Sequence, residues 1–252
     1  MAIKIIPRPL QAKGQFNGGE ILENKPIGFP REGGVGMPYS SLFYWAHAWS
    51  DHGSTIGEHP HQGFEIMSFV LKGDIEHYDS KNRRWIPLKE GDTQIIRAGN
   101  GISHAERLNA GSHIFQIWLD PDLRKTLGQP ASYDDYRGED FLVSEENGMV
   151  TTWYAGKNGR MNVETPGVEI RKIAMEEGTF SIPVSTDKIH SLYLIEGQIT
   201  LGGETLNSDD FAIISDSDTI NLEAGPSSVV FIISSPAKME YATYAKMSGM
   251  RQ

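Results

Sequence analysis

Short apolar segments separated by polar turns recur along most of the chain. Typical examples are EIMSFVLKG, TQIIRAG, HIFQIWLD, SLYLIEGQITLG, FAIISDSD and SVVFIISS, which are rich in Ile, Val and Phe and are bounded by turn-forming residues. Segments of this kind predict β-strands, and their succession is typical of sandwiches and barrels. Helical periodicity is weak, and its best candidate is the short stretch from Asp122 to Leu127. The pattern therefore predicts an all-β protein.

Two parts of this strand pattern resemble each other. SFVLKGDI at 68–75 is similar to LYLIEGQI at 192–199, and GDTQII at 91–96 is similar to DDFAII at 209–214. The two offsets, 124 and 118 residues, nearly agree, and the order of the segments is the same. A repeat of this kind favours a duplicated barrel, with a longer hairpin in the first copy.

A polar stretch separates the two halves. From Pro121 to Gly148 the chain contains Pro, Gly and many charged residues but few β-branched ones, which is typical of a connection between compact units. We therefore expect a first barrel over residues 1–125, a connecting segment over 126–148 and a second barrel over 149–252.

The composition excludes several classes of function. The 33 acidic and 23 basic side chains give a net charge of −10, which opposes direct binding to nucleic acid. No run of about 18 apolar residues is present, and MAIKIIPRPL lacks the apolar centre of a signal peptide. We therefore expect a cytoplasmic protein with no membrane partner. Because cysteine is absent, any metal must be held by His, Asp, Glu or backbone oxygen.

Seven of the eight histidines lie in the first half, where the motifs His-Pro-His and His-Ala-Glu stand out. Alternate side chains on a strand face the same side, so His59 and His61 converge, as do His104 and Glu106. Across a small barrel this set supplies three nitrogens and one carboxylate oxygen. Such ligands suit Fe(II), Mn(II), Ni(II), Cu(II) or Zn(II) and leave coordination positions open.

Glu65 is an alternative carboxylate ligand. It has the same parity as His59 and His61, but it lies four residues farther on, about 13 Å along an extended strand. Gly63 could bend the chain and shorten that distance. The spacing favours Glu106 as the ligand, and Glu65 is then expected beside the site. A single His-x-His on a strand usually binds nothing, so the metal prediction depends on the two motifs occurring together.

Other residues near the motifs are expected around the pocket. His52, Trp49 and Phe64 are candidates for its rim or for the layer behind the ligands. His77 is expected at a strand surface or beside the ligands. His190, which is alone in the second half, is expected at the surface or at the joint between the halves.

The motifs are similar to those of one known family. GSTIGEHPHQGFEIMSFVLKG resembles the first cupin motif, and HPHQGFE followed by LKGDIEHYDS and GDTQIIRAGNGISHAE is similar to pirins, two-cupin proteins of the quercetinase-like group. FQIWLDPDLRKTLGQPASYDDY also resembles the pirin segment that leaves the first barrel. The resemblance is specific from Gly53 to Tyr136 and only architectural beyond that range.

The resemblance implies two tandem cupin barrels, of the double-stranded β-helix or jelly-roll type, with short helices. It also implies one metal, usually iron, in the first barrel. By motif its ligands fall on His59, His61, His104 and Glu106, whereas the position of Glu65 is not normally a ligand. AHAWSDHGSTIG departs from the wording usual in the family before the first motif, so the pocket rim and the substrate preference are not carried over.

The second half lacks an equivalent donor set. The two offsets place Pro183, Ser185, Leu222 and Ala224 opposite the four ligand positions of the first half. Apart from the weak hydroxyl ligand of Ser185, none of these side chains can bind a metal. We therefore expect the second barrel to be metal-free.

The resemblance implies two competing functions. The first is a quercetin 2,3-dioxygenase-like oxidoreductase that acts with O₂ on a small chelating substrate of the flavonol type, with Glu106 as the general base. The second is a non-enzymatic, iron-dependent regulator that binds a protein partner, for which the net charge of −10 is better suited than for DNA. We favour the enzyme, although the fold alone does not decide between them.

Overall fold

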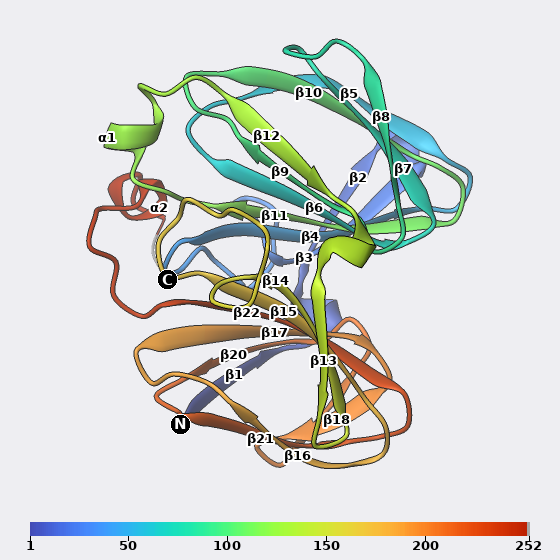
Figure 1. Cartoon of the computed structure of the whole chain (residues 1–252), viewed down its shortest axis with the longest axis vertical. Coiled ribbons are helices and arrows are strands. Elements are labelled where there is room, and N and C mark those ends of the chain that lie inside the picture. The colour runs from blue at the N-terminus through green and yellow to red at the C-terminus, as the bar shows by residue number, and fades with distance from the viewer. Residues whose placement is uncertain (251–252) are drawn as a thin grey trace. The chain divides into compact units, whose positions relative to one another are not determined.

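The computed structural model describes residues 1–250, and this part of the chain folds into twenty-two strands with two short α-helices (Figure 1). The prediction of an all-β protein is confirmed. Helix α1 (Leu123–Thr126) lies within the stretch predicted to be helical, and its N-cap, Asp122, accepts a hydrogen bond from the Arg124 N–H. Within residues 1–250, no helix is long and apolar enough to cross a membrane.

The elements divide between two compact units, here called the first and the second barrel. The first barrel contains residues 11–140 and the chain from Tyr241 on, and the second contains residues 1–10 and 141–240. The strands of the first barrel are β2 (Ala12–Phe16), β3 (Ile21–Ile27), β4 (Leu42–Ser50), β5 (Ser54–His61), β6 (Glu65–Lys72), β7 (Asp74–Asp79), β8 (Trp85–Lys89), β9 (Thr93–Arg97), β10 (Ile102–Leu108), β11 (Ser112–Leu119) and β12 (Ser132–Tyr136); this barrel also carries α1 and α2 (Tyr244–Met247). The strands of the second barrel are β1 (Ala2–Ile6), β13 (Leu142–Glu146), β14 (Met149–Ala155), β15 (Glu169–Met175), β16 (Gly178–Pro183), β17 (Lys188–Glu196), β18 (Gln198–Leu201), β19 (Glu204–Asn207), β20 (Phe211–Ser215), β21 (Thr219–Ala224) and β22 (Ser228–Pro236).

Each barrel is made of a seven-stranded and a four-stranded sheet. The larger sheets run β12-β9-β6-β11-β4-β3-β2 and β1-β20-β17-β22-β15-β14-β13, and the smaller sheets run β5-β10-β7-β8 and β16-β21-β18-β19. The two orders correspond strand for strand, so β5 is equivalent to β16 and β4 to β15. All the strand pairs are antiparallel, which allows one face of each sheet to be apolar and to pack against the other sheet.

The unit boundaries differ from the expected ones at residues 125 and 149. Strand β1 pairs with β20, with Ile3 opposite Ile214, so the first ten residues belong to the second barrel (Figure 1). Strand β12 pairs with β9, with Tyr133 opposite Ile96, so most of the expected connecting segment belongs to the first barrel. β12 in the first barrel and β1 in the second are the edge strands of the two larger sheets. Each pairs with backbone groups of its neighbour that would otherwise remain unpaired.

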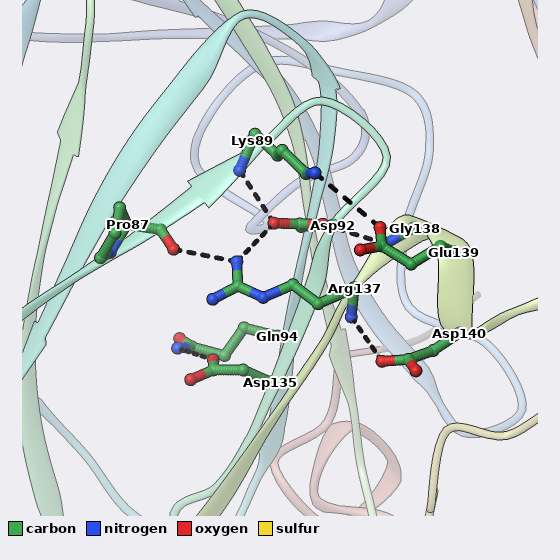
Figure 2. Close-up of polar contacts among 9 residues, drawn as sticks. All are labelled: Pro87, Lys89, Asp92, Gln94, Asp135, Arg137, Gly138, Glu139 and Asp140. Atoms are coloured by element: carbon green, nitrogen blue, oxygen red, sulfur yellow. Dashed lines mark hydrogen bonds and ion pairs between the residues drawn. The ribbon is translucent and has the colours of Figure 1, made fainter.

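A buried carboxylate anchors the chain that follows β12. Asp92 is 1% exposed, and it accepts hydrogen bonds from the Gly138 N–H at 2.9 Å and from Nη1 of Arg137 at 2.7 Å (Figure 2). Beside this pair, Nε2 of Gln94 donates to Oδ1 of Asp135 at 2.7 Å. A buried carboxylate requires such partners, so these contacts bind residues 135–138 to the first barrel.

Candidate metal centre

Three histidine side chains meet where β5 pairs with β10. His59 and His61 alternate on β5, and His104 on β10 lies directly opposite His59. Nε2 of His104 is 2.9 Å from Nε2 of His61 and 3.0 Å from Nε2 of His59. One ligand atom from each of the three residues lies within 4.8 Å of the others. The two sequence motifs therefore do bring three nitrogens to one point.

The protonation of these rings suits a metal. Nδ1 of His59 lies 2.8 Å from the carbonyl oxygen of Gly57, which can only accept, so Nδ1 is the donor there and Nε2 is the nitrogen that faces His104. Burial and, after it, the neighbouring histidines lower the pKa of His61 to about 3, and burial lowers the pKa of His104 well below its ordinary value. Neutral imidazoles are the form that binds divalent transition metals, so the donor set fits such an ion.

Glu106 lies two residues beyond His104 but outside this nitrogen cluster. Its carboxylate is buried, and it accepts hydrogen bonds from Oγ of Ser68 at 2.9 Å and from Nε2 of Gln116. The pairing of β5 with β10 is irregular between His104 and Glu106, because β5 has an extra residue there. Within residues 1–250, the group that could hold a metal therefore consists of the three histidines, with an oriented carboxylate nearby.

The alternative carboxylate, Glu65, lies elsewhere. Gly63 has a φ of +81°, and the chain turns there from β5 in the small sheet to β6 in the large one. Glu65 begins β6 with the opposite parity to Ser68, and its Oε1 lies 3.9 Å from Nε of Arg97. The bend at Gly63 thus places Glu65 in an ion pair rather than in the histidine cluster.

A cavity of about 510 Å³ opens beside the cluster. Two of the histidines, His59 and His61, lie in its wall, and the remaining walls come from β2, β3, β4 and β11 and from the loop after β3. The aromatic residues that line it are Phe16, Phe29, Tyr44 and Trp118, and the polar residues include Glu23, Lys25, Glu32 and Gln116.

Trp118 joins the aromatic wall to the metal centre. Its ring meets the ring of His61 edge-on, with centroids 4.9 Å apart, and it packs against Phe29 and Tyr44. Its indole N–H donates to Oε1 of Gln116 at 3.3 Å, and the amide of Gln116 in turn donates to Glu106. One hydrogen-bonded chain therefore connects the cavity wall with the buried carboxylate.

A second polar group lies on another wall of the cavity. Nζ of Lys25 is 2.6 Å from Oε1 of Glu32 and 3.1 Å from Oε2 of Glu23, and the Tyr44 hydroxyl donates to Oε1 of Glu23 at 3.2 Å. Burial raises the pKa of Glu23 and raises that of Tyr44 well above its ordinary value. The wall therefore offers both hydrogen-bond donors and acceptors to a polar ligand.

The residues expected at the rim occupy three different places. Phe64 packs against Phe43 and Trp118, with ring centroids 4.6 and 6.1 Å apart, and so lies behind the aromatic wall. Trp49 stacks on His113, on the face of β4 opposite to Tyr44. His52 is exposed in the turn between β4 and β5. Of these residues, Phe64 contacts Trp118, which lines the cavity.

Two further histidines, His77 and His190, are buried rather than exposed at a strand surface. His77 is 1% exposed, and its ring centroid lies 5.4 Å from that of His104, so it lies beside the cluster. His190 is also 1% exposed, so the expectation of a surface position is wrong. Its burial is possible because Ser234 and the carbonyl oxygen of Ser185 satisfy its two ring nitrogens.

The second barrel has aliphatic side chains at the ligand positions. Ile182 of β16 lies opposite Ile220 of β21. In the first barrel, His59 of β5 lies opposite His104 of β10 in the same way. On this register the four equivalent positions are Ile182, Val184, Ile220 and Leu222. The positions expected from the sequence offsets are therefore wrong by one or two residues, because the turns after β16 and before β21 differ in length from those after β5 and before β10.

The cavity walls were not predicted from the sequence. Trp118 and Gln116 alternate on the strand that follows the His-Ala-Glu motif, so their shared face was readable from parity alone. Their contact with the first motif requires the pairing of the two sheets. Lys25, Glu23 and Phe29 lie well before the motifs, and no local signal connects them with the site.

Comparison with known proteins places the chain in a family. The family model described as Pirin matches residues 40–119. A protein of Pasteurella multocida, provisionally named quercetin 2,3-dioxygenase, is 30% identical over 176 residues, which cover 66% of this chain and 70% of that protein. The quercetin 2,3-dioxygenase of Escherichia coli K12 is 26% identical over 191 residues, which cover 73% of this chain and 78% of that protein.

The fold is found in solved structures over nearly its whole length. The crystal structure of the bacterial pirin YhhW of Escherichia coli in complex with nickel(II) matches with a TM-score of 0.79 at 22% identity, over 94% of this chain and 100% of that one. A quercetin 2,3-dioxygenase of Acinetobacter baumannii matches with a TM-score of 0.80 at 18% identity, over 93% and 79% of the two chains. The expected architecture of two tandem cupin barrels is thus confirmed, and the chain belongs to the pirin family.

Proposed function

We propose that this pirin is a quercetin 2,3-dioxygenase-like oxidoreductase that acts with O₂ on a small chelating substrate of the flavonol type. The observation that carries the proposal is the position of His59 and His61, two of the three converging histidines, in the wall of a cavity of about 510 Å³ that also has four aromatic side chains in its lining. Small-molecule sites commonly have this size and a mainly apolar lining with a few polar groups. The names of the relatives from Escherichia coli and Pasteurella multocida support the same reaction class.

His59, His61, His104 and Glu106 would hold one divalent metal, for which we propose Fe(II). Mn(II), Ni(II), Cu(II) and Zn(II) have compatible ligand preferences. The ion would supply Lewis acidity and open coordination positions for a chelating substrate. The proposed role of Glu106 is supported by its two hydrogen bonds, because each carboxylate oxygen accepts one of them and keeps a second lone pair.

Glu106 is also the proposed general base. A flavonol must lose the proton of its enolic hydroxyl as it reacts, and the buried carboxylate of Glu106, two residues beyond His104, would accept it. Gln116 would hold this carboxylate in one orientation, and Trp118, Phe29 and Tyr44 would stack on the rings of the substrate. Lys25 and Glu23 would bind phenolic hydroxyl groups away from the metal.

The test is turnover by protein loaded anaerobically with Fe(II). We expect quercetin to be consumed together with O₂, and a flavone without the 3-hydroxyl group to be left unchanged. His104→Ala should abolish both metal content and turnover, whereas the matched variant His52→Ala, in an exposed turn, should retain both. If the loaded protein holds its metal but consumes no O₂ with quercetin or any other 3-hydroxyflavone, the proposal is wrong. Metal-dependent binding of a protein partner would then be the function to test.

A further inference from the structure

The second barrel contains a cavity of its own, of about 370 Å³. Its walls come from β13, β14, β15 and β16, the strands equivalent to β2, β3, β4 and β5, which contribute to the cavity beside the metal centre. Its apolar lining includes Met149, Ile173 and Ile182, which are buried in the core of the second barrel. The side chains at the ligand positions are aliphatic, so this cavity can bind an organic molecule but not a metal through those positions.

Arg171 from β15 lines this cavity. Its Nη2 donates to the carbonyl oxygen of Pro183 at 2.8 Å, and its guanidinium carbon lies 5.4 Å from the centre of the Trp153 ring. The strand registers make Ala46 of the first barrel the equivalent residue, since Lys172 lies opposite Phe231 as His47 lies opposite Phe115. The second barrel therefore has a guanidinium where the first has a methyl group.

The guanidinium of Arg171 makes few hydrogen bonds to protein acceptors. It has five N–H donors, and among residues 1–250 only the Pro183 carbonyl accepts a hydrogen bond from one of them. Partial burial lowers the pKa of Arg171, and the nearby charge of Glu169 raises it by less. A carboxylate is the natural bidentate partner for such a group.

The charged neighbours of Arg171 leave room for an anion. Glu169 also lines the cavity, but it pairs with Nζ of Lys188 at 2.8 Å. Glu146 is exposed on the edge strand β13, and Lys157, also exposed, is a second cation of the lining. The partly buried charge that faces the apolar lining is therefore positive.

We propose that the cavity of the second barrel binds a small aromatic monocarboxylate, whose carboxylate pairs with Arg171 and whose ring packs on Met149, Ile173 and Ile182. Lys157 adds a second positive charge at the exposed end of the lining. This site lies wholly within the second barrel and does not depend on the metal centre or on the function proposed for it.

Benzoate is a suitable probe, with benzamide as its uncharged counterpart. In titrations of the full, metal-loaded chain we expect saturable binding of benzoate, and binding of benzamide at least about tenfold weaker, because the charge-assisted pair is lost. The indole N–H of Trp153, which donates to Oγ of Ser144, should shift in ¹⁵N-resolved spectra as benzoate is added. Benzoate binding that does not saturate, or equal binding of benzamide, would overturn the proposal.

Variants locate the site. Arg171→Gln should weaken benzoate binding at least about tenfold, and Arg171→Lys should have a smaller effect, because it keeps the charge but not the forked geometry. The matched control is Arg107→Gln, since Arg107 also lies over an indole, at 4.3 Å from the Trp85 ring, but pairs with Glu76 at 2.6 Å. His104→Ala should lose metal and keep benzoate binding.

Three outcomes would contradict this assignment. They are unchanged affinity in Arg171→Gln, loss of benzoate binding in His104→Ala, and spectral shifts that spare Trp153. If Arg171→Gln does not fold, the comparison of benzoate with benzamide on the wild type and the Arg171→Lys variant still decide the matter.

Discussion

Nε2 of His61 lies 2.9 Å from Nε2 of His104, across the pairing of β5 with β10. Two ring nitrogens at this distance must share either a proton or a cation. Burial keeps both imidazoles neutral at neutral pH, and the third histidine adds another nitrogen at the same point. The contact is therefore the structural basis for expecting a metal in this barrel.

Removal of one of these imidazoles should release the metal. We expect His61→Ala to hold much less than one metal per chain after Fe(II) loading and gel filtration, as measured by elemental analysis. His52→Ala removes a histidine from an exposed turn and should match the wild type. Equal metal content in the two variants would show that the ion is bound elsewhere.

Loss of the amide that orients Glu106 should impair the site without removing a ligand. In Gln116→Ala the carboxylate keeps only its hydrogen bond from Ser68, so we expect metal affinity or turnover to fall by about 10–100-fold. Metal titration and steady-state kinetics would measure the two effects. Gln62→Ala is the control, since the Gln62 amide donates to the Asn100 carbonyl oxygen in an exposed position. A Gln116→Ala variant with wild-type affinity and rate would mean that Glu106 needs no such support.

The anchor at Asp92 should matter for the stability of the first barrel. Asp92→Ala leaves the Gly138 N–H without this acceptor and Arg137 with the carbonyl oxygen of Pro87 but no carboxylate there, and we expect the free energy of unfolding to fall by about 2–4 kcal/mol. Urea denaturation would measure this loss. Lys89→Ala breaks only the ion pair with Glu139, between side chains that are 65% and 71% exposed, and should change the stability by less than about 0.5 kcal/mol. Similar losses in the two variants would contradict this account.

His190 should make the second barrel sensitive to acid. Burial holds the pKa of His190 below its ordinary value of 6.5. As the pH falls through 6.5, His190 is therefore protonated in the unfolded chain before it is protonated in the folded chain. Its contribution to stability is complete above that pH and is lost toward the folded pKa, by at most about 1.4 kcal/mol per pH unit. His190→Gln should reduce the loss of stability between neutral pH and about pH 5, whereas His52→Gln should not. Parallel stability curves for His190→Gln and the wild type would refute the prediction.

Local patterns were enough to predict part of this structure. Short apolar segments bounded by turn residues predicted the strands, and the two histidine motifs predicted the three converging histidines. Each of these signals lies within a few consecutive residues. The position of Glu65 could not be fixed in this way. It depends on the turn at Gly63, where the chain passes from one sheet to the other.

Features that depend on distant pairing could not be read from the sequence. The sequence alignment of the two halves was correct for Phe69 and Tyr193, because Phe69 lies opposite Phe115 and Tyr193 lies opposite Phe231. It was wrong by one or two residues at β16 and β21, where turn lengths differ. The cavity walls likewise come from β2, β3, β4 and β11, which pack together only after both sheets have formed. Arg171 gives no signal in the sequence, because a single arginine in a strand is usually exposed.

The exchange of β1 into the second barrel has a consequence for the order of synthesis. Ala2 pairs with Ser215, so β1 has no partner until more than two hundred further residues have been made. At about 5–20 residues per second, that delay is about 10–40 s. Throughout this interval the apolar β1 segment, AIKII, stays without its partner strand. The nascent chain is therefore expected to be most vulnerable to proteases and most dependent on chaperones before β20 emerges.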